Sequence, residues 1–122
     1  MLFRSTAAAF SANEQAWKFN VKNSNQAEFL KYGINGKYEA HVDTSIIPHP
    51  ELPCRKLTAL LFLNENFEGG KFYLSCEHEK IYPPQKTGNV LIFPSFFLHG
   101  VEPVTKGTRY SVVTWLVGPW FN

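Results

Sequence analysis

From residue 37 onward, hydrophobic and polar positions form short runs separated by turn residues. Runs of β-branched, aromatic and other apolar residues, bounded by glycine, proline and asparagine, are typical of strands. The expected strands cover residues 37–42, 57–64, 71–75, 81–82, 89–94, 101–104 and 108–117. Short strands with turns at this spacing predict a sandwich or a barrel.

The first thirty residues have the least regular pattern. Residues 7–10 and 14–18 are expected to form short helical pieces, and residues 26–30 a further helical turn. Apolar runs are far too short to span a bilayer, and the polar residues at positions 4–6 interrupt any signal-peptide core. We therefore expect a single domain over residues 1–122, located in the cytoplasm.

The segment TSIIPHPELPCRK, residues 44–56, interrupts the strand pattern. It contains Pro48, Pro50 and Pro53, and proline lacks the backbone N–H that a central strand donates to its neighbours. A loop of this length is unusual in a compact domain, and it is therefore a candidate for function.

Composition and charge narrow the function classes. The net charge is +2, and the basic residues form no block longer than pairs such as Arg55-Lys56, which argues against nucleic-acid binding. Aromatic residues make up 16% of the chain, which suits packing on pleated sheets. Without a secretory signal, Cys54 and Cys76 are expected to be free thiols.

His41 and Asp43 stand two residues apart at the end of an expected strand, so their side chains point to the same face. An imidazole and a carboxylate that converge in this way suit a first-row metal ion. The other histidines are His49 in the proline-rich segment, His78 in the charged stretch CEHEK, and His99. His99 follows NVLIFPSFFL, a run expected to be buried, so we choose it as the third ligand.

Two histidines and one carboxylate are the ligand set of non-haem Fe(II) oxygenases. Each motif alone also has an ordinary explanation, because a His-x-Asp sequence arises by chance and a histidine after an apolar run is often structural. Arg109 adds weight to the metal hypothesis. A hairpin of residues 101–104 and 108–117, with a turn at residues 105–107, would return Arg109 to the level of the metal.

Arg109 shares one face of its expected strand with Ser111, Val113 and Trp115. A guanidinium on the inward face would be costly without an anion. A dicarboxylic co-substrate would supply that anion through a two-pronged contact, and Ser111 would add a hydroxyl donor. An outward Arg109 in a surface salt bridge is the alternative.

Together these motifs resemble a known family. Tyr32, HVD at residues 41–43, FLNENFEGGKFYL and GNVLIFPSFFLHGVEPVTKGTRYSVVTW are similar, in this order, to the 2-oxoglutarate/Fe(II)-dependent dioxygenases of prolyl hydroxylase type. The resemblance covers about residues 32–117. It implies a mainly β fold, a double-stranded β-helix or jelly-roll-like barrel, with short N-terminal helical segments.

The resemblance also implies a role for individual residues. His41, Asp43 and His99 match the iron ligands of the family. Arg109 matches the residue that grips the distal carboxylate of 2-oxoglutarate, and Tyr32 matches a tyrosine that lines the co-substrate pocket.

The chain departs from the family pattern in two respects. Phe62 stands where some members carry a co-substrate-binding tyrosine, so Tyr32, Thr58 or Ser111 would have to compensate. Trp115, by contrast, matches an aromatic position near the active site. The segment before the first ligand strand is shorter than in most members, as in a minimal or truncated version or one that pairs with itself to cover an exposed sheet.

The implied activity is hydroxylation of a C–H bond, coupled to oxidative decarboxylation of 2-oxoglutarate. It would use Fe(II), 2-oxoglutarate and dioxygen, with ascorbate as a candidate reductant. The expected substrate is a prolyl residue of a peptide or protein, over which the loop at residues 44–56 would close. A free amino acid or small metabolite is the runner-up, and a non-catalytic metal-binding module of cupin type is a further alternative.

Overall fold

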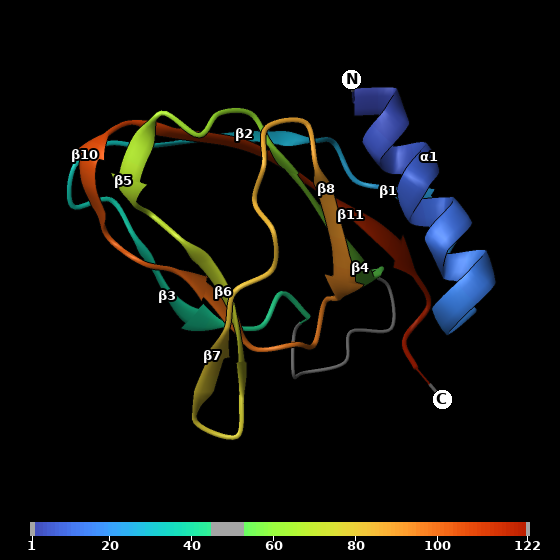
Figure 1. The fold of residues 1–122 in the computed structure, drawn as a ribbon. Coiled ribbons are helices and arrows are strands. Elements are labelled where there is room, and N and C mark those ends of the chain that lie inside the picture. The colour runs from blue at the N-terminus through green and yellow to red at the C-terminus, as the bar shows by residue number, and fades with distance from the viewer. Residues whose placement is uncertain (1, 45–52, 122) are drawn as a thin grey trace.

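The structure is a computed structural model that describes residues 2–44 and 53–121. Figure 1 shows its ribbon. The elements, in chain order, are α1 (Leu2–Ala12), the π-helical turn η1 (Asn13–Trp17), β1 (Asn23–Ser24), β2 (Glu28–Tyr32), β3 (Tyr38–His41), β4 (Cys54–Phe62), β5 (Phe67–Gly69), β6 (Phe72–Cys76), β7 (Glu79–Ile81), β8 (Val90–Pro94), β9 (His99–Val101), β10 (Val104–Gly107) and β11 (Arg109–Gly118).

Antiparallel strands form two sheets that face each other (Figure 1). The larger sheet has the order β1-β11-β4-β8, and β2 also pairs with β11. The smaller sheet has the order β3-β9-β6-β7, and β10 pairs with β5 as a separate ribbon. The arrangement is the double-stranded β-helix expected from the sequence.

The two central strands of the larger sheet, β4 and β11, are buried on both faces. Their inward side chains, such as Leu60 and Trp115, pack against Phe72 and Val101 of the smaller sheet. Their outward side chains, such as Leu116, pack under α1. Because successive side chains of a strand alternate between faces, burial on both sides explains the uninterrupted apolar run at residues 59–62 in β4.

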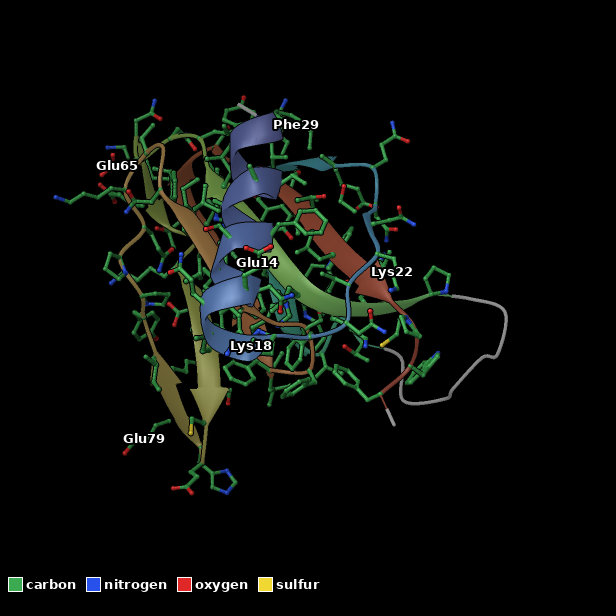
Figure 2. All side chains as sticks on the ribbon, turned by 90° about the vertical axis from the view of Figure 1, so that its right-hand side faces the viewer. Glu14, Lys18, Lys22, Phe29, Glu65 and Glu79 are labelled. Atoms are coloured by element: carbon green, nitrogen blue, oxygen red, sulfur yellow. The ribbon has the colours of Figure 1, made fainter. Side chains whose placement is uncertain are left out.

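The helical pieces expected within residues 7–18 form one continuous body, in which α1 runs directly into η1. Lys18 ends it in a left-handed conformation, with φ 53°. The Asn13 side chain closes this end, because its amide donates to the carbonyl of Phe19 and its oxygen accepts from the N–H of Phe19. Figure 2 shows the helix in front of the larger sheet, with Glu14 on its exposed side.

The helical turn expected at residues 26–30 is wrong. The segment belongs to β2, which pairs with β11 so that Tyr32 lies opposite Arg109. Leu30 faces the interior, whereas Phe29 is exposed, and this period of two suits a strand. A short apolar run is compatible with helix or strand, and here pairing with β11 decides between them.

The hairpin expected between residues 101–104 and 108–117 is also wrong. The chain leaves the smaller sheet at Pro103, and β10 then pairs with β5 rather than with β11. Residues 105–107, expected to form a turn, lie in β10. Arg109 begins β11, which pairs with β1, β2 and β4.

The strand expected at residues 101–104 is also wrong, because β9 ends at Val101 and β10 begins at Val104. The remaining strands, expected at residues 37–42, 57–64, 71–75, 81–82, 89–94 and 108–117, are confirmed to within a few residues at their ends. The strands β1 and β5 were not expected. Most of the proline-rich segment, with His49, lies outside the described residues, and its last part, from Cys54, belongs to β4. Cys54 and Cys76 are both free thiols, as expected. Among the described residues, no helix is long and apolar enough to cross a membrane.

Candidate metal centre and anion pocket

His41, Asp43 and His99 come together at one end of the smaller sheet. His41 ends β3 and His99 begins β9, and the two residues pair directly across these strands. Asp43 follows closely, and its backbone N–H donates to the carbonyl of Ser95 at 2.8 Å. One ligand atom from each of the three side chains lies within 4.8 Å of the others.

Backbone carbonyls orient both imidazoles. Nδ1 of His41 lies 2.8 Å from the carbonyl of Glu39, and Nδ1 of His99 lies 2.8 Å from that of Phe97. Only an N–H can donate to a carbonyl, so a neutral ring in this position carries a lone pair on Nε2. These Nε2 atoms lie 3.2 and 3.4 Å from the Asp43 carboxylate. Acceptors that face one another in this way fit a cation between them, and carbonyl-bonded imidazoles are typical of metal ligands.

The Asp43 carboxylate is buried and held by hydrogen bonds. Thr58 donates to Oδ2 at 2.8 Å, and the Trp115 indole N–H donates to the same oxygen at 3.1 Å. Burial works to raise the pKa of Asp43. When Nε2 of His99 carries a proton in place of a metal, its hydrogen bond and positive charge, together with the hydrogen bonds of Trp115 and Thr58, bring that pKa down to about 2. The side chain is therefore ionised at neutral pH, which is the form that binds metals.

A cavity of about 300 Å³ opens beside these three residues. Phe72, Phe93 and Leu60 contribute to its apolar wall. Arg109 lines the same cavity and is 2% exposed. The metal-ligand candidates and a buried cation thus line one cavity.

The guanidinium of Arg109 is only partly satisfied. Its Nη1 donates to the Ser111 hydroxyl at 3.0 Å, whereas Nε and Nη2 have no hydrogen-bond partner among the described residues. Burial lowers the pKa of Arg109, and Tyr32 opposes this change. Unpartnered buried N–H groups are costly, so this geometry fits an anion in the cavity. The inward orientation predicted for Arg109 is confirmed, and a surface salt bridge is excluded.

Two rings flank the guanidinium, with Cζ of Arg109 5.5 Å from the ring centre of Tyr32 and 5.9 Å from that of Phe62. Burial raises the pKa of Tyr32 despite the nearby arginine, so its hydroxyl is neutral and can donate. Two other hydroxyls were predicted to compensate for the absent phenol at position 62. The Ser111 hydroxyl accepts a hydrogen bond from the guanidinium, whereas the Thr58 hydroxyl donates a hydrogen bond to Asp43.

Comparison with known proteins agrees with this geometry. The family model described as "2OG-Fe(II) oxygenase superfamily" matches residues 27–117. The PKHD-type hydroxylase of Psychrobacter sp. (strain PRwf-1) is 34% identical over 93 residues, which cover 72% of this chain. The PKHD-type hydroxylase YbiX of Escherichia coli O6:K15:H31 is 33% identical over 92 residues, again 72% of this chain. The chain belongs to the 2OG-Fe(II) oxygenase superfamily.

Solved structures share the fold of this chain. A prolyl-4-hydroxylase of Pseudomonas putida superposes with a TM-score of 0.72 at 20% identity, covering 92% of this chain and 62% of that one. A prolyl hydroxylase of Trichoplax adhaerens, in complex with a peptide fragment of hypoxia inducible factor, gives 0.74 at 22% identity, covering 95% and 54%. The chain spans 36% of the Psychrobacter relative and 41% of YbiX, which is less than half the length of either.

The sequence analysis did not predict two charged residues that line the cavity, Glu28 and Arg55. Glu28 lies in β2, which was expected to be helical. Arg55 lies in the end of the segment expected to be a loop, where the pairing of β11 with β4 shifts register between Leu116 and Val117. Arg55 could have been found if residues 54–56 had been predicted as strand. The register shift on the neighbouring strand β11, however, cannot be predicted from the sequence around Arg55.

The run before His99 is buried only in part, which corrects the expectation for NVLIFPSFFL. Ser95 is fully buried, whereas Phe96, Phe97 and Leu98 are 50%, 42% and 41% exposed. His99 nevertheless points inward, because β9 begins there as a new strand of the smaller sheet.

Proposed function

We propose that this chain is a 2-oxoglutarate- and Fe(II)-dependent dioxygenase that hydroxylates prolyl residues in a peptide or protein. One observation carries the proposal. The converging atoms of His41, Asp43 and His99 share a cavity with Nε and Nη2 of the buried Arg109, two nitrogens that have no hydrogen-bond partner among the described residues. The names of the relatives, PKHD-type hydroxylases, support hydroxylation, and the prolyl hydroxylases among the fold neighbours support the choice of proline.

The three convergent residues would hold the iron and leave coordination positions open for 2-oxoglutarate and dioxygen. Bound iron supplies oxygen activation, in which one oxygen atom enters the substrate C–H bond and the other enters 2-oxoglutarate as it loses carbon dioxide to become succinate. The backbone contacts to His41 and His99 keep their Nε2 atoms available for the metal.

Arg109 would bind the distal carboxylate of 2-oxoglutarate through its free Nε–H and Nη2–H groups. Ser111 accepts from Nη1 of Arg109, so its own hydroxyl proton remains available to the same carboxylate. The hydroxyl of Tyr32 is a further donor on the cavity wall. These groups would fix one end of the co-substrate while the apolar wall limits access of water.

Arg55 supports a peptide as substrate. Its guanidinium lies 3.7 Å over the ring of Trp115 and lines the cavity, and it forms no ion pair with any described residue. Its N–H groups also donate to no acceptor among the described residues, so they could donate to carbonyl oxygens, which a peptide offers on either side of its proline.

A free amino acid is the second candidate substrate, and one observation favours it. Glu28 and Arg55 line the same cavity with opposite charges and form no ion pair with each other. This pair suits the ammonium and carboxylate of a zwitterion. Glu28→Gln would then raise KM for free proline but leave KM for a proline-containing peptide unchanged.

The test is an assay with Fe(II), 2-oxoglutarate and dioxygen, with and without ascorbate. Succinate release is measured with proline-containing peptides and with free proline, and mass spectrometry detects a product heavier by one oxygen atom. We expect substrate-dependent succinate and a hydroxylated peptide. If another metabolite gained oxygen and proline never did, the prolyl assignment would be wrong. Absence of any succinate would leave the non-catalytic cupin-type module.

A further inference from the structure

The two oxygens of Asp43 have different surroundings. Oδ2 accepts from the Thr58 hydroxyl at 2.8 Å and from the Trp115 indole N–H at 3.1 Å, with Nε2 of His99 at 3.4 Å. Among the described residues, Oδ1 faces only Nε2 of His41, at 3.2 Å. A carboxylate oxygen has about two lone-pair sites, so the two donors occupy those of Oδ2 and leave Oδ1 free.

Ser95 fixes the Thr58 hydroxyl in turn. Both residues are buried, and their hydroxyl oxygens lie 3.0 Å apart. Because the proton of Thr58 goes to Asp43, Ser95 is the donor between the two hydroxyls. The carbonyl of Ser95 also accepts from the backbone N–H of Asp43 at 2.8 Å. Ser95 thus ties the main chain and, through Thr58, the carboxylate of Asp43 to one point of the cavity wall.

Packing and pairing fix the second donor. Trp115 belongs to the buried interior cluster, and Cζ of Arg55 lies 3.7 Å over its ring. A guanidinium at this distance holds an indole by a cation–π contact. Trp115 and Thr58 pair directly across β11 and β4, so both donors reach Asp43 from adjacent strands of the larger sheet.

We propose that Thr58 and Trp115 are positioning residues of the metal centre, which hold Oδ2 of Asp43 so that Oδ1 faces the metal as a single ligand atom. The inference rests on the proposed function and deepens it. A carboxylate anchored by one oxygen resists turning to bind with both, so it leaves the remaining coordination positions to 2-oxoglutarate and dioxygen. Groups that orient metal ligands in this way commonly change metal affinity by about 10- to 100-fold.

The test compares metal binding of variants in the absence of turnover. Thr58→Val removes one donor with little change of shape, and Trp115→Phe removes the other but keeps an aromatic ring. Each should weaken Mn(II) binding about 10-fold or more in calorimetric titration. Each should also alter the absorption bands of Co(II) bound in place of iron. Thr58→Ser keeps the donor and should restore both properties.

Thr114→Val is the matched control. Thr114 is buried on β11, and its hydroxyl donates to the carbonyl of Asn25 at 3.0 Å, away from the cavity. Loss of this hydroxyl should leave Mn(II) affinity and the Co(II) spectrum unchanged, although it also removes a buried hydrogen bond.

Two results would overturn the inference. One is that Thr58→Val binds Mn(II) as tightly as the wild type and has the wild-type Co(II) spectrum. If Trp115→Phe does not fold, Thr58→Val alone decides the question. The other is an equal loss in Thr114→Val, because any buried hydroxyl would then have the same effect. Failure of the wild-type chain to bind Mn(II) would instead overturn the proposed function, and this inference with it.

Discussion

Arg109 combines a buried charge with two N–H groups that lack partners among the described residues. Arg109→Met should therefore stabilise the ligand-free chain, since an unsatisfied buried polar group costs about 1–3 kcal/mol. The same change should weaken 2-oxoglutarate binding about 10- to 100-fold, because it removes charge-assisted hydrogen bonds. Thermal unfolding and calorimetric titration with Mn(II) present measure the two effects. Lys106→Met, at an exposed lysine, is the control.

Arg109→Lys separates charge from shape at the same position. Lysine keeps the positive charge but cannot present two parallel N–H groups to a carboxylate. We expect 2-oxoglutarate affinity between those of the wild type and Arg109→Met, with Mn(II) affinity unchanged. Full wild-type affinity would show that a point charge suffices and that the fork geometry is not used.

The histidines provide a matched comparison of ligand candidates. His99→Ala should abolish Mn(II) binding, because it removes one of three converging ligand atoms. His78→Ala should leave binding intact, since His78 lies in the exposed turn between β6 and β7. Titration of both variants checks this expectation, and equal loss in the two would place the site elsewhere.

The main candidates of the site could be predicted from single residues, but their neighbours could not. The spacing of His41 and Asp43 predicts that their side chains lie on the same face, because residues i and i+2 of a strand share a face. Arg109 stands out because a charged side chain on an inward face requires an anion. Ser95 and Arg55 reach the site through strand pairing and a register shift, which depend on distant segments. Thr58 was predicted at the co-substrate, and only the fold shows that it contacts Asp43.

At the scale of elements, alternation of apolar and polar residues predicted most strands but not their partners. The chain moves from the smaller sheet to the β5–β10 ribbon at Pro103, where the local sequence predicts a hairpin. Proline and glycine mark both kinds of connection, so the sequence alone does not distinguish them. The segment of β2 was predicted as helix for a related reason. Its short apolar run forms a strand only because it pairs with β11.

Substitution of Gly100 tests whether the strands that carry the histidines must pack closely to bind metal. Gly100 lies in β9 beside His99, and a Cβ there would come within 2.7 Å of Cζ of Tyr73 and 2.8 Å of the carbonyl of Tyr38. Gly100→Ala must therefore displace the Tyr73 ring and push β9 away from the backbone of β3. We expect a loss of about 1–3 kcal/mol in unfolding free energy, typical of overpacking, together with weaker Mn(II) binding. Denaturant unfolding and titration measure both.

Gly33→Ala is the control for this prediction, because a Cβ at Gly33 would meet no atom within 4 Å. It should leave both quantities unchanged. A Gly100→Ala variant as stable as the wild type, with normal Mn(II) affinity, would show that β9 tolerates displacement and that the ligand geometry does not depend on close strand packing.

At the scale of the whole molecule, the two sheets contribute different halves of one site. His41 and His99 come from the smaller sheet, whereas Arg109 comes from the larger one. Because both halves line one cavity, a ligand that contacts both would hold the sheets together. A ligand that bridges the two sheets would thus couple metal and anion binding to stability.

The coupling predicts how ligands raise the unfolding temperature. With Mn(II), 2-oxoglutarate would contact the metal through its keto acid and Arg109 through its distal carboxylate, so it should stabilise the chain by about 2.7 kcal/mol at 100 times its Kd. Glutarate retains the carboxylate for Arg109 but has no keto acid, so it should stabilise less at the same concentration.

Removal of the metal with EDTA should reduce the effect of 2-oxoglutarate to that of glutarate, because only the contact with Arg109 remains. Differential scanning calorimetry measures these shifts. Equal shifts from both acids in the presence of Mn(II) would mean that the co-substrate does not bridge the two sheets.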